Sequence, residues 1–375
     1  MRRIIVAIIV LLFCIEMLAL PHHAKPEDRL VGKLIWKFNA GYRAHLAAAN
    51  GVIYAASPTG CDDTVPCGPP ARLFALDALT GAQKWMIEGI GDDSAPVIAD
   101  GLVYQAAGSL FAVNAQTGRV EWKLKPPTYG TVMYSPVIAE GTIFFWDVNG
   151  LIPSGFFYGG TLYAFDLHTR QQKWKFLVPS GMVSRPVAGD GLIYVATRDD
   201  ETLKGSLYAL DAGTGRVRWK FAVAGSNPAI RQGVVYYAGA DGNLYALDAR
   251  RGKKLWQFKC TSRPSRAFPT LQLSSASVGD RLIYCALYRQ SLHAVDSSNG
   301  HQKWEFKVEL AYPHSAVADG LVYVESFEGQ LYAIDATTGR EIWTFKMDNG
   351  LASPPVVLND IVYLVRHDGY IYAIK

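Results

Sequence analysis

Among the residues that could carry chemistry in this 375-residue chain, the cysteines are the most informative. Cys61 and Cys67 enclose the five residues DDTVP, and in a chain that leaves the reducing cytoplasm so close a pair is expected to form a disulfide. Closing this short loop would contribute about 2 kcal/mol to stability. Cys285 falls within an apolar strand pattern and Cys260 at the end of another, so both are expected to be free thiols in the core.

The sequence offers little for acid–base, nucleophilic or metal chemistry. The acidic run Asp199-Asp200-Glu201 lacks the spaced oxygen ligands and the glycine of a loop calcium site, so we interpret it as a solvated loop tip. No G-x-S-x-G, H-E-x-x-H or phosphate-binding loop occurs, and the eight histidines are scattered. Without an acid, base or nucleophile at a recognisable spacing, no catalytic residue is predicted.

Composition narrows the class of protein. The formal net charge is only +4 and no basic tract of the kind that binds nucleic acid occurs, so no nucleic-acid partner is expected. Half of the residues are apolar, which is ample for a large core. The 35 glycines and 20 tyrosines are typical of many short β-strands separated by turns.

The N-terminus has the character of a targeting segment. The basic start MRR precedes 17 residues, IIVAIIVLLFCIEMLAL, of which only one is charged. We interpret residues 1–24 as a signal peptide or, if uncleaved, a membrane anchor, and residues 25–32 as a linker. Either alternative places residues 33–375 outside the cytoplasm, touching the membrane only through an uncleaved anchor. The lack of an N-x-S/T sequon agrees with a bacterial source.

A repeated unit sets the organisation of the rest of the chain. LYALDAGTGRVRWKF at 207–221 has clear counterparts at 110–124, 244–258 and 331–345. Seven copies place a tryptophan twelve residues after the leucine that opens the strand. An eighth tryptophan stands near the N-terminus without that strand. The eight recurring tryptophans are Trp36, Trp85, Trp122, Trp174, Trp219, Trp256, Trp304 and Trp343.

The two ends of the chain complete one repeat between them. Residues 369–375 begin a copy that stops before its tryptophan, and residues 33–38 supply the missing tryptophan strand. A repeat of about 40 residues with four short strands is one propeller blade. The sequence therefore predicts an all-β protein, an eight-bladed β-propeller of four-stranded antiparallel blades. Pairing of the N- and C-terminal strands closes the ring, and we expect a monomer.

The repeat allows strand boundaries and roles to be predicted. In residues 94–125 we expect strands at 95–99, 102–106, 109–114 and 120–125, with tight turns at Asp100-Gly101 and Thr117-Gly118. The recurring aspartate is expected to cap its turn through backbone N–H groups. The eight tryptophans are interpreted as rings that fill the wedges between blades. A ligand-binding role for them is the weaker alternative.

The segments 75–85, 209–219 and 333–343 share the pattern A-x-D-x-x-T-G-x-x-x-W. This pattern resembles the tryptophan-docking motif of the pyrroloquinoline-quinone-type propeller repeat, with mild departures such as Arg170 in place of glycine. The resemblance extends over residues 33–375 and implies one of two functional groups. One is the quinoprotein dehydrogenases. The other is non-catalytic scaffolds, such as the barrel-assembly lipoprotein of the bacterial outer membrane.

The resemblance to the dehydrogenases would imply a quinone on a tryptophan floor, covered by a disulfide between adjacent cysteines, and a Ca²⁺ ion. This chain has no Cys-Cys pair and no recognisable ligand set. We therefore expect the scaffold branch, with no catalytic residue, cofactor or metal. The alternative is a dehydrogenase, or a relic of one, that binds pyrroloquinoline quinone with Ca²⁺.

Every insertion into the repeat falls on one face of the expected propeller, in residues 57–71, 146–160, 198–205 and 261–274. Loops on a rigid scaffold often carry function, so this face is the expected binding site for a protein or peptide, although neutral decoration is the alternative. The candidate binding residues are Trp146, Phe156, Phe157, Tyr158, Arg263, Arg266 and Phe268. Their aromatic rings either form an exposed patch or fold inward over the propeller.

Overall fold

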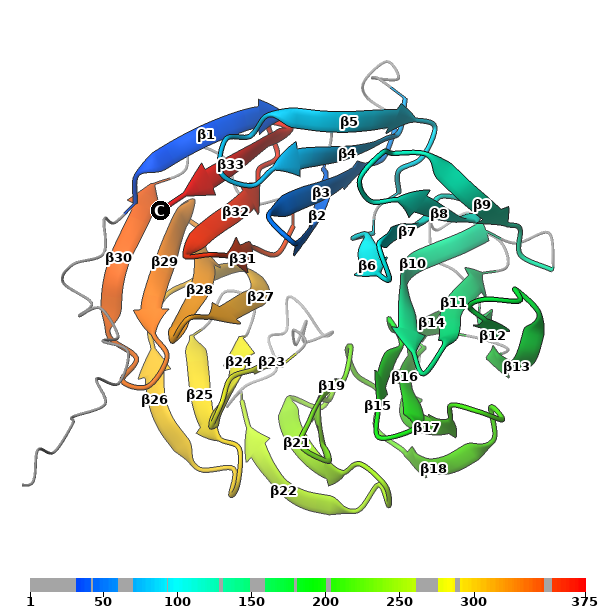
Figure 1. The fold of residues 1–375 in the computed structure, drawn as a ribbon. Helices are drawn as coiled ribbons and strands as arrows, with labels where there is room; N and C mark the ends of the chain where they lie inside the picture. Colours follow the sequence, from blue (N-terminus) through cyan, green and yellow to red (C-terminus); the bar gives the residue numbers. More distant parts are fainter. Residues whose placement is uncertain are drawn as a thin grey trace, which may run out of the picture. The chain divides into compact units, whose positions relative to one another are not determined.

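The computed structural model describes residues 32–41, 43–59, 70–92, 94–127, 131–148, 159–178, 181–199, 204–260, 276–286, 291–346 and 353–375. In these ranges the regular structure is β-strand, arranged in eight antiparallel sheets (Figure 1). Seven sheets have four strands, and the eighth has a short fifth strand.

Each sheet is one blade, and its strands run in order from the centre of the ring outward. Blades 1 to 4 comprise β2 (His45–Ala49), β3 (Val52–Ser57), β4 (Arg72–Asp77) and β5 (Gln83–Glu88); β6 (Val97–Ala99), β7 (Leu102–Ala106), β8 (Leu110–Asn114) and β9 (Val120–Leu124); β10 (Thr131–Ala139), β11 (Thr142–Val148), β12 (Gly160–Asp166) and β13 (Gln172–Val178); β14 (Met182–Val183), β15 (Val187–Gly189), β16 (Leu192–Arg198), β17 (Gly205–Asp211) and β18 (Val217–Phe221). Blades 5 to 8 comprise β19 (Ala229–Arg231), β20 (Val234–Ala238), β21 (Asn243–Asp248) and β22 (Lys254–Lys259); β23 (Ser277–Val278), β24 (Leu282–Ala286), β25 (Leu292–Asp296) and β26 (Gln302–Phe306); β27 (Leu310–Ala318), β28 (Leu321–Ser326), β29 (Gln330–Asp335) and β30 (Glu341–Lys346); β31 (Val356–Leu358), β32 (Ile361–Val365), β33 (Tyr370–Ile374) and β1 (Leu34–Asn39). We call the four positions strands A to D, from the innermost to the outermost. In blade 4, β14 and β15 share position A, because both pair with β16.

The predicted strands of blade 2 agree with the observed ones to within two residues. The largest difference is at strand A, which begins at Val97 instead of residue 95. Pro96 precedes it and has no N–H to donate to a ladder, which explains the later start. Asp100 (φ 49°) and Gly101 (φ 74°) form the expected left-handed turn between strands A and B.

The blades follow one another around a closed ring. The innermost strands β2, β6, β10, β15, β19, β23, β27 and β31 each contact the next, and β31 contacts β2 (Figure 1). The prediction of an eight-bladed propeller is confirmed.

Blade 8 is built from both ends of the described chain, as predicted. Strand β1 pairs antiparallel with β33, with Trp36 opposite Ala373 and Lys37 opposite Tyr372. The Lys33 N–H donates to the Lys375 carbonyl at 2.8 Å, and the Lys375 N–H donates back at 3.0 Å. This pairing closes the ring and removes two sheet edges that would otherwise be open.

The hydrophobic core lies between neighbouring blades. Strands B and C are covered on both faces, so they read as continuous apolar runs, as in residues 53–56. One core cluster joins Trp36, Tyr363 and Ile371 of blade 8 to Leu46 and Leu76 of blade 1, and equivalent clusters join the other neighbours. Strands D lie outermost and alternate exposed with covered side chains. The contacts that hold the ring together are therefore contacts between repeats.

Candidate functional site

The recurring tryptophans lie between blades. Six of them place the indole ring on a glycine of the next blade's C–D turn and donate the Nε1–H to a carbonyl oxygen of the same turn. The donor and acceptor pairs are Trp36–Ala78, Trp85–Ala115, Trp174–Ala212, Trp219–Ala249, Trp256–Ser297 and Trp304–Ala336, at 2.8 to 3.2 Å. The other two, Trp122 and Trp343, pack into the interfaces with blades 3 and 8. These rings are engaged by the scaffold itself.

The glycines beneath the rings have no room for a side chain. A Cβ atom on Gly252 would lie 2.5 Å from the ring of Trp219, and one on Gly215 would lie 2.7 Å from the ring of Trp174. Both glycines also have positive φ, at 65° and 70°. The turn that faces Trp122 holds Arg170 instead, with φ of 60°.

A second aromatic residue of each interface was missed by the sequence analysis. It is the tyrosine of strand B in seven blades and Phe144 in blade 3. Its ring packs against the docking tryptophan, as Tyr363 does on Trp36 with 5.7 Å between the ring centroids. The Tyr363 hydroxyl donates to the Ala78 carbonyl at 2.9 Å, the same oxygen that accepts the Trp36 Nε1–H. Burial raises the pKa of Tyr363 to about 12, so its hydroxyl stays a donor. The recurring V-Y and I-Y pairs of strand B were the available signal.

The recurring aspartate caps its turn, as predicted. The Asp211 Oδ1 accepts the backbone N–H of Thr214 at 2.9 Å and its hydroxyl at 2.8 Å, while Arg218 pairs with Oδ2 at 3.0 Å. Equivalent contacts, led by the Ser298 hydroxyl, lower the pKa of Asp296 to about 2. These carboxylates stay ionised and serve the turns.

The insertion-bearing face is only partly within the described residues. Phe156, Phe157, Tyr158, Arg263, Arg266 and Phe268 lie outside them, and so do Cys61 and Cys67. Trp146 is described, and it is fully buried.

The Trp146 indole lies in the core between blades 3 and 4 and donates to the Ser184 carbonyl at 2.9 Å. Its proposed place in an exposed patch is therefore wrong, and the inward alternative holds. The reason is its position on strand B, where blades 1, 2, 4, 5 and 6 carry a buried alanine.

The expectation of free thiols at Cys260 and Cys285 is also wrong. The two residues form a disulfide with their Cα atoms 6.8 Å apart. Cys260 follows strand D of blade 5 and Cys285 lies on strand B of blade 6, so the bond joins two blades. His293 lies opposite Cys285 and packs on Phe258 with 5.8 Å between the ring centroids. Burial lowers the pKa of His293.

Several buried polar side chains lie at the B–C ends of strands B, toward the insertion-bearing face. Gln105 and Asp147 are fully buried, and Glu325 is 2% exposed. The Gln105 Nε2 donates to the Ala106 carbonyl at 2.8 Å. Arg366 pairs with Asp368 at 3.5 Å. Buried neutral, acidic and basic side chains therefore lie beneath the loops of the insertion-bearing face.

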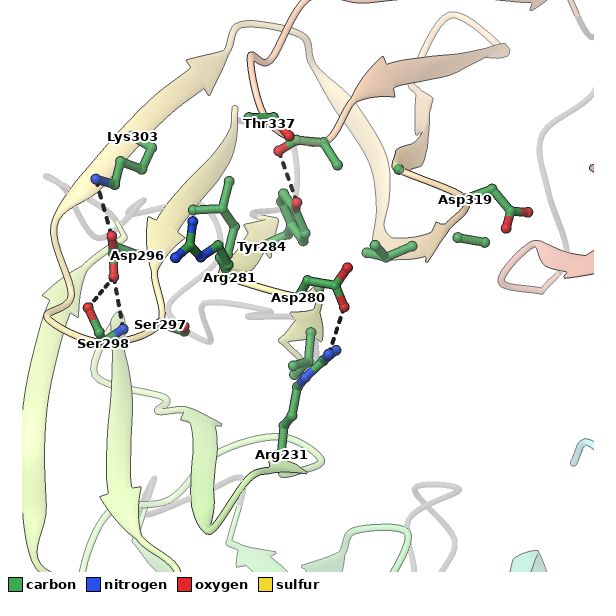
Figure 2. Close-up of a pocket in the computed structure, with 17 residues that line it drawn as sticks. Arg231, Asp280, Arg281, Tyr284, Asp296, Ser297, Ser298, Lys303, Asp319 and Thr337 are labelled. Carbon is green, nitrogen blue, oxygen red and sulfur yellow. Dashed lines mark hydrogen bonds and ion pairs between the residues drawn. The ribbon is translucent and has the colours of Figure 1, made fainter. Parts of the chain in front are cut away.

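The opposite face, which carries the A–B and C–D turns, has a hollow that the sequence analysis did not foresee. It has a volume of about 970 Å³ and is lined by turns of blades 5, 6 and 7 (Figure 2). Arg231 pairs with Asp280 at 2.7 Å, and Lys303 pairs with Asp296 at 3.1 Å. Arg281 is drawn between these two ion pairs. Arg281 stands in a turn where six other blades have glycine, and this substitution was the sequence signal that could have drawn attention to it.

Among the residues that the structure describes, no group of three His, Cys, Asp or Glu side chains is arranged to hold a metal ion. In the same part of the chain, no helix has the length and apolar character needed to cross a membrane.

The closed ring, the stacked tryptophans and the capped turns together define a propeller of pyrroloquinoline-quinone-type repeats. The model of the outer membrane protein assembly factor BamB family matches residues 27–150, 158–312 and 289–375. The chain belongs to this family.

Similar proteins fall into more than one functional class. The serine/threonine-protein kinase AfsK of Streptomyces griseus is 32% identical over 148 residues, which is 35% of this chain and 17% of the kinase. The dehydrogenase subunit of the quinone alcohol dehydrogenase of Gluconacetobacter polyoxogenes is 29% identical over 131 residues, 26% of this chain and 16% of that subunit. The chain thus spans less than a fifth of the length of either relative.

Solved structures show the same fold in BamB and in an alcohol dehydrogenase. BamB from Moraxella catarrhalis matches with a TM-score of 0.67 at 16% identity, covering 92% of this chain and 97% of its own. Quinohemoprotein alcohol dehydrogenase from Comamonas testosteroni matches with a TM-score of 0.65 at 15% identity, covering 91% and 76%. The shared fold alone does not distinguish a scaffold from an enzyme.

Proposed function

We propose that this protein is an exported, non-catalytic propeller that binds protein or peptide segments during the assembly of cell-envelope proteins. The observation that carries the proposal is the match to the BamB family along nearly the whole chain. The tryptophans support it, because the rings that a ligand might use are engaged between blades. The insertion-bearing face remains the proposed binding face, with Phe156, Phe157, Tyr158, Arg263, Arg266 and Phe268 as its contact residues.

Export is supported by the buried disulfide between Cys260 and Cys285, because structural disulfides persist in oxidising compartments and are rare in the cytoplasm. The proposed roles of residues 1–24 as signal peptide or anchor and of Cys61 and Cys67 as a second disulfide agree with such a compartment. Cell fractionation tests export, and alkylation of the protein without reductant tests whether the cysteines are paired. A cytoplasmic protein with free thiols at Cys260 and Cys285 would contradict export.

The binding function is tested by capture of partners from envelope extracts. A variant shortened at residues 150–159 is expected to lose partners that the wild type retains. Lys220→Ala, on the exposed face of a D strand, is the control and should retain them. An unchanged set of partners in the shortened variant would contradict the assignment to this face.

A quinone-dependent dehydrogenase, or a quinone-binding relic of one, is the second candidate, because a quinone alcohol dehydrogenase subunit is among the similar proteins. The test is to add pyrroloquinoline quinone and Ca²⁺ and to follow the bound chromophore and dye reduction with alcohols or sugars. The scaffold function predicts neither signal. Turnover above that of a heat-denatured sample would establish the enzyme instead.

A further inference from the structure

Blade 6 departs from the repeat at the turn between strands A and B. In blade 4 this turn is Asp190-Gly191, and both residues have positive φ, at 53° and 73°. In blade 6 the equivalent residues are Asp280 and Arg281, and neither has positive φ. A turn that presents a glycine in six other blades therefore presents a long cationic side chain in blade 6, and that side chain lines the hollow of Figure 2.

Arg281 differs from the other cations of this hollow. The Arg231 guanidinium is held by Asp280 at 2.7 Å, and the Lys303 ammonium is held by Asp296 at 3.1 Å. Within the part of the chain that the structure describes, the side chain of Arg281 makes no ion pair or hydrogen bond. Its backbone carbonyl accepts the Ser297 N–H at 3.0 Å, which fixes the base of the side chain against the neighbouring turn.

The chemistry of the walls restricts what the hollow can accept. A guanidinium offers a planar fork of donors that matches a carboxylate. The lining carries three carboxylates, Asp280, Asp296 and Asp319, and three cations, Arg231, Arg281 and Lys303, so it has no surplus of positive charge for a polyanion. The volume of about 970 Å³ is at the upper end of the range for ligand pockets, large enough for a short segment of peptide. These features together fit a chain with one carboxylate and neighbouring N–H or amino donors.

We propose that this hollow binds a peptide segment of a partner protein, with one carboxylate of the segment paired to Arg281 and donor groups facing the aspartates. This inference rests on the proposed binding function and adds a second contact face to it. The tyrosine at the base stays in place, because the Tyr284 hydroxyl donates to the Ala336 carbonyl at 3.0 Å and burial raises its pKa to about 12. Arg281 is thus the specificity-determining residue.

The test uses the full chain and a fluorescein-labelled, C-terminally amidated octapeptide of glycine and serine with one glutamate and one lysine, and binding is followed by fluorescence anisotropy. We expect saturable binding that weakens about 10-fold in Arg281→Gly, which restores the glycine of the repeat and is expected to keep the fold. Arg119→Gly removes an exposed turn arginine of blade 2 and is the matched control. It should bind like the wild type.

The peptide supplies its own control. Replacing its glutamate with glutamine keeps the shape and removes the charge, and should weaken binding as much as Arg281→Gly does. Equal binding of the two peptides, equal binding by Arg281→Gly and wild type, or no binding by the wild type would each overturn the inference. Displacement by millimolar inorganic phosphate as effective as by unlabelled peptide would identify a small-anion site and also overturn it. None of these outcomes bears on partner capture by the insertion-bearing face, so the two proposals fail separately.

Discussion

The glycine beneath each docking tryptophan provides a quantitative test of how the blades are held together. Gly252 lies under Trp219, where a Cβ atom would come 2.5 Å from the ring. Gly101 has a similar positive φ, 74° against 65°, but nothing lies within 4 Å of the position of its Cβ. The substitutions Gly252→Ala and Gly101→Ala therefore introduce the same backbone strain, and only the first displaces a ring.

The expected costs follow from these contacts. A left-handed alanine costs about 1 kcal/mol, so Gly101→Ala should lower the free energy of unfolding by about that amount. Gly252→Ala should cost about 3 kcal/mol, because crowding a packed ring adds about 2 kcal/mol. The difference of about 2 kcal/mol is roughly a 30-fold change in the folding equilibrium constant and about 3 °C in Tm for a domain of this size.

The assay is chemical and thermal unfolding of the two single variants, Trp219→Ala and the double variant. Trp219→Ala alone should cost about 3–5 kcal/mol, as other large-to-small core changes do. In the Trp219→Ala background, Gly252→Ala should cost only the backbone strain of about 1 kcal/mol, because the ring that it crowds is gone. Equal costs for Gly252→Ala and Gly101→Ala, or strict additivity in the double variant, would refute the reasoning.

Three further predictions concern other contacts between and within blades. Cys260→Ser opens a disulfide whose cysteines are 25 residues apart and should cost about 3.5 kcal/mol, measured by unfolding with and without reductant. Unchanged stability would mean that the bond does not form. Tyr363→Phe removes one of two donors to the Ala78 carbonyl and should cost about 1 kcal/mol by denaturant titration, with no loss meaning that the bond is weak. The lowered pKa of Asp296 contributes stability that is complete above about pH 4 and is lost as the pH falls towards 2, so Asp296→Asn should flatten the acid limb of the unfolding profile. An acid limb as steep as that of the wild type would contradict this.

Much of the fold could be read from the sequence because it repeats. The spacing from leucine to tryptophan recurs in seven copies, and the two chain ends complete one another, so blade number and closure followed. The turn chemistry was also local, since the aspartate that caps a turn and the threonine that it binds are three residues apart. Patterns confined to one repeat carry this information because each blade folds from neighbouring segments of chain.

Contacts between repeats were harder to predict from the sequence. Cys260 and Cys285 stand in different blades, and only the packing of one blade's outer strand end on the next blade's inner strand brings them together. Trp146 falls in a segment that reads as a loop insertion, yet it lies on a buried strand and faces the next blade. Arg281 is only a substitution in the sequence, and its availability for a ligand depends on which neighbours pair with one another.

The sequence by itself therefore determined the repeat, the number of blades, the closing strands and the family resemblance. The tertiary structure alone decided which cysteines pair, which aromatic residues are buried and which hollow Arg281 lines. The physical reason is that hydrophobic period and turn residues act within one blade. Burial, disulfide geometry and charge pairing depend on the angle and spacing between blades, which no single repeat contains.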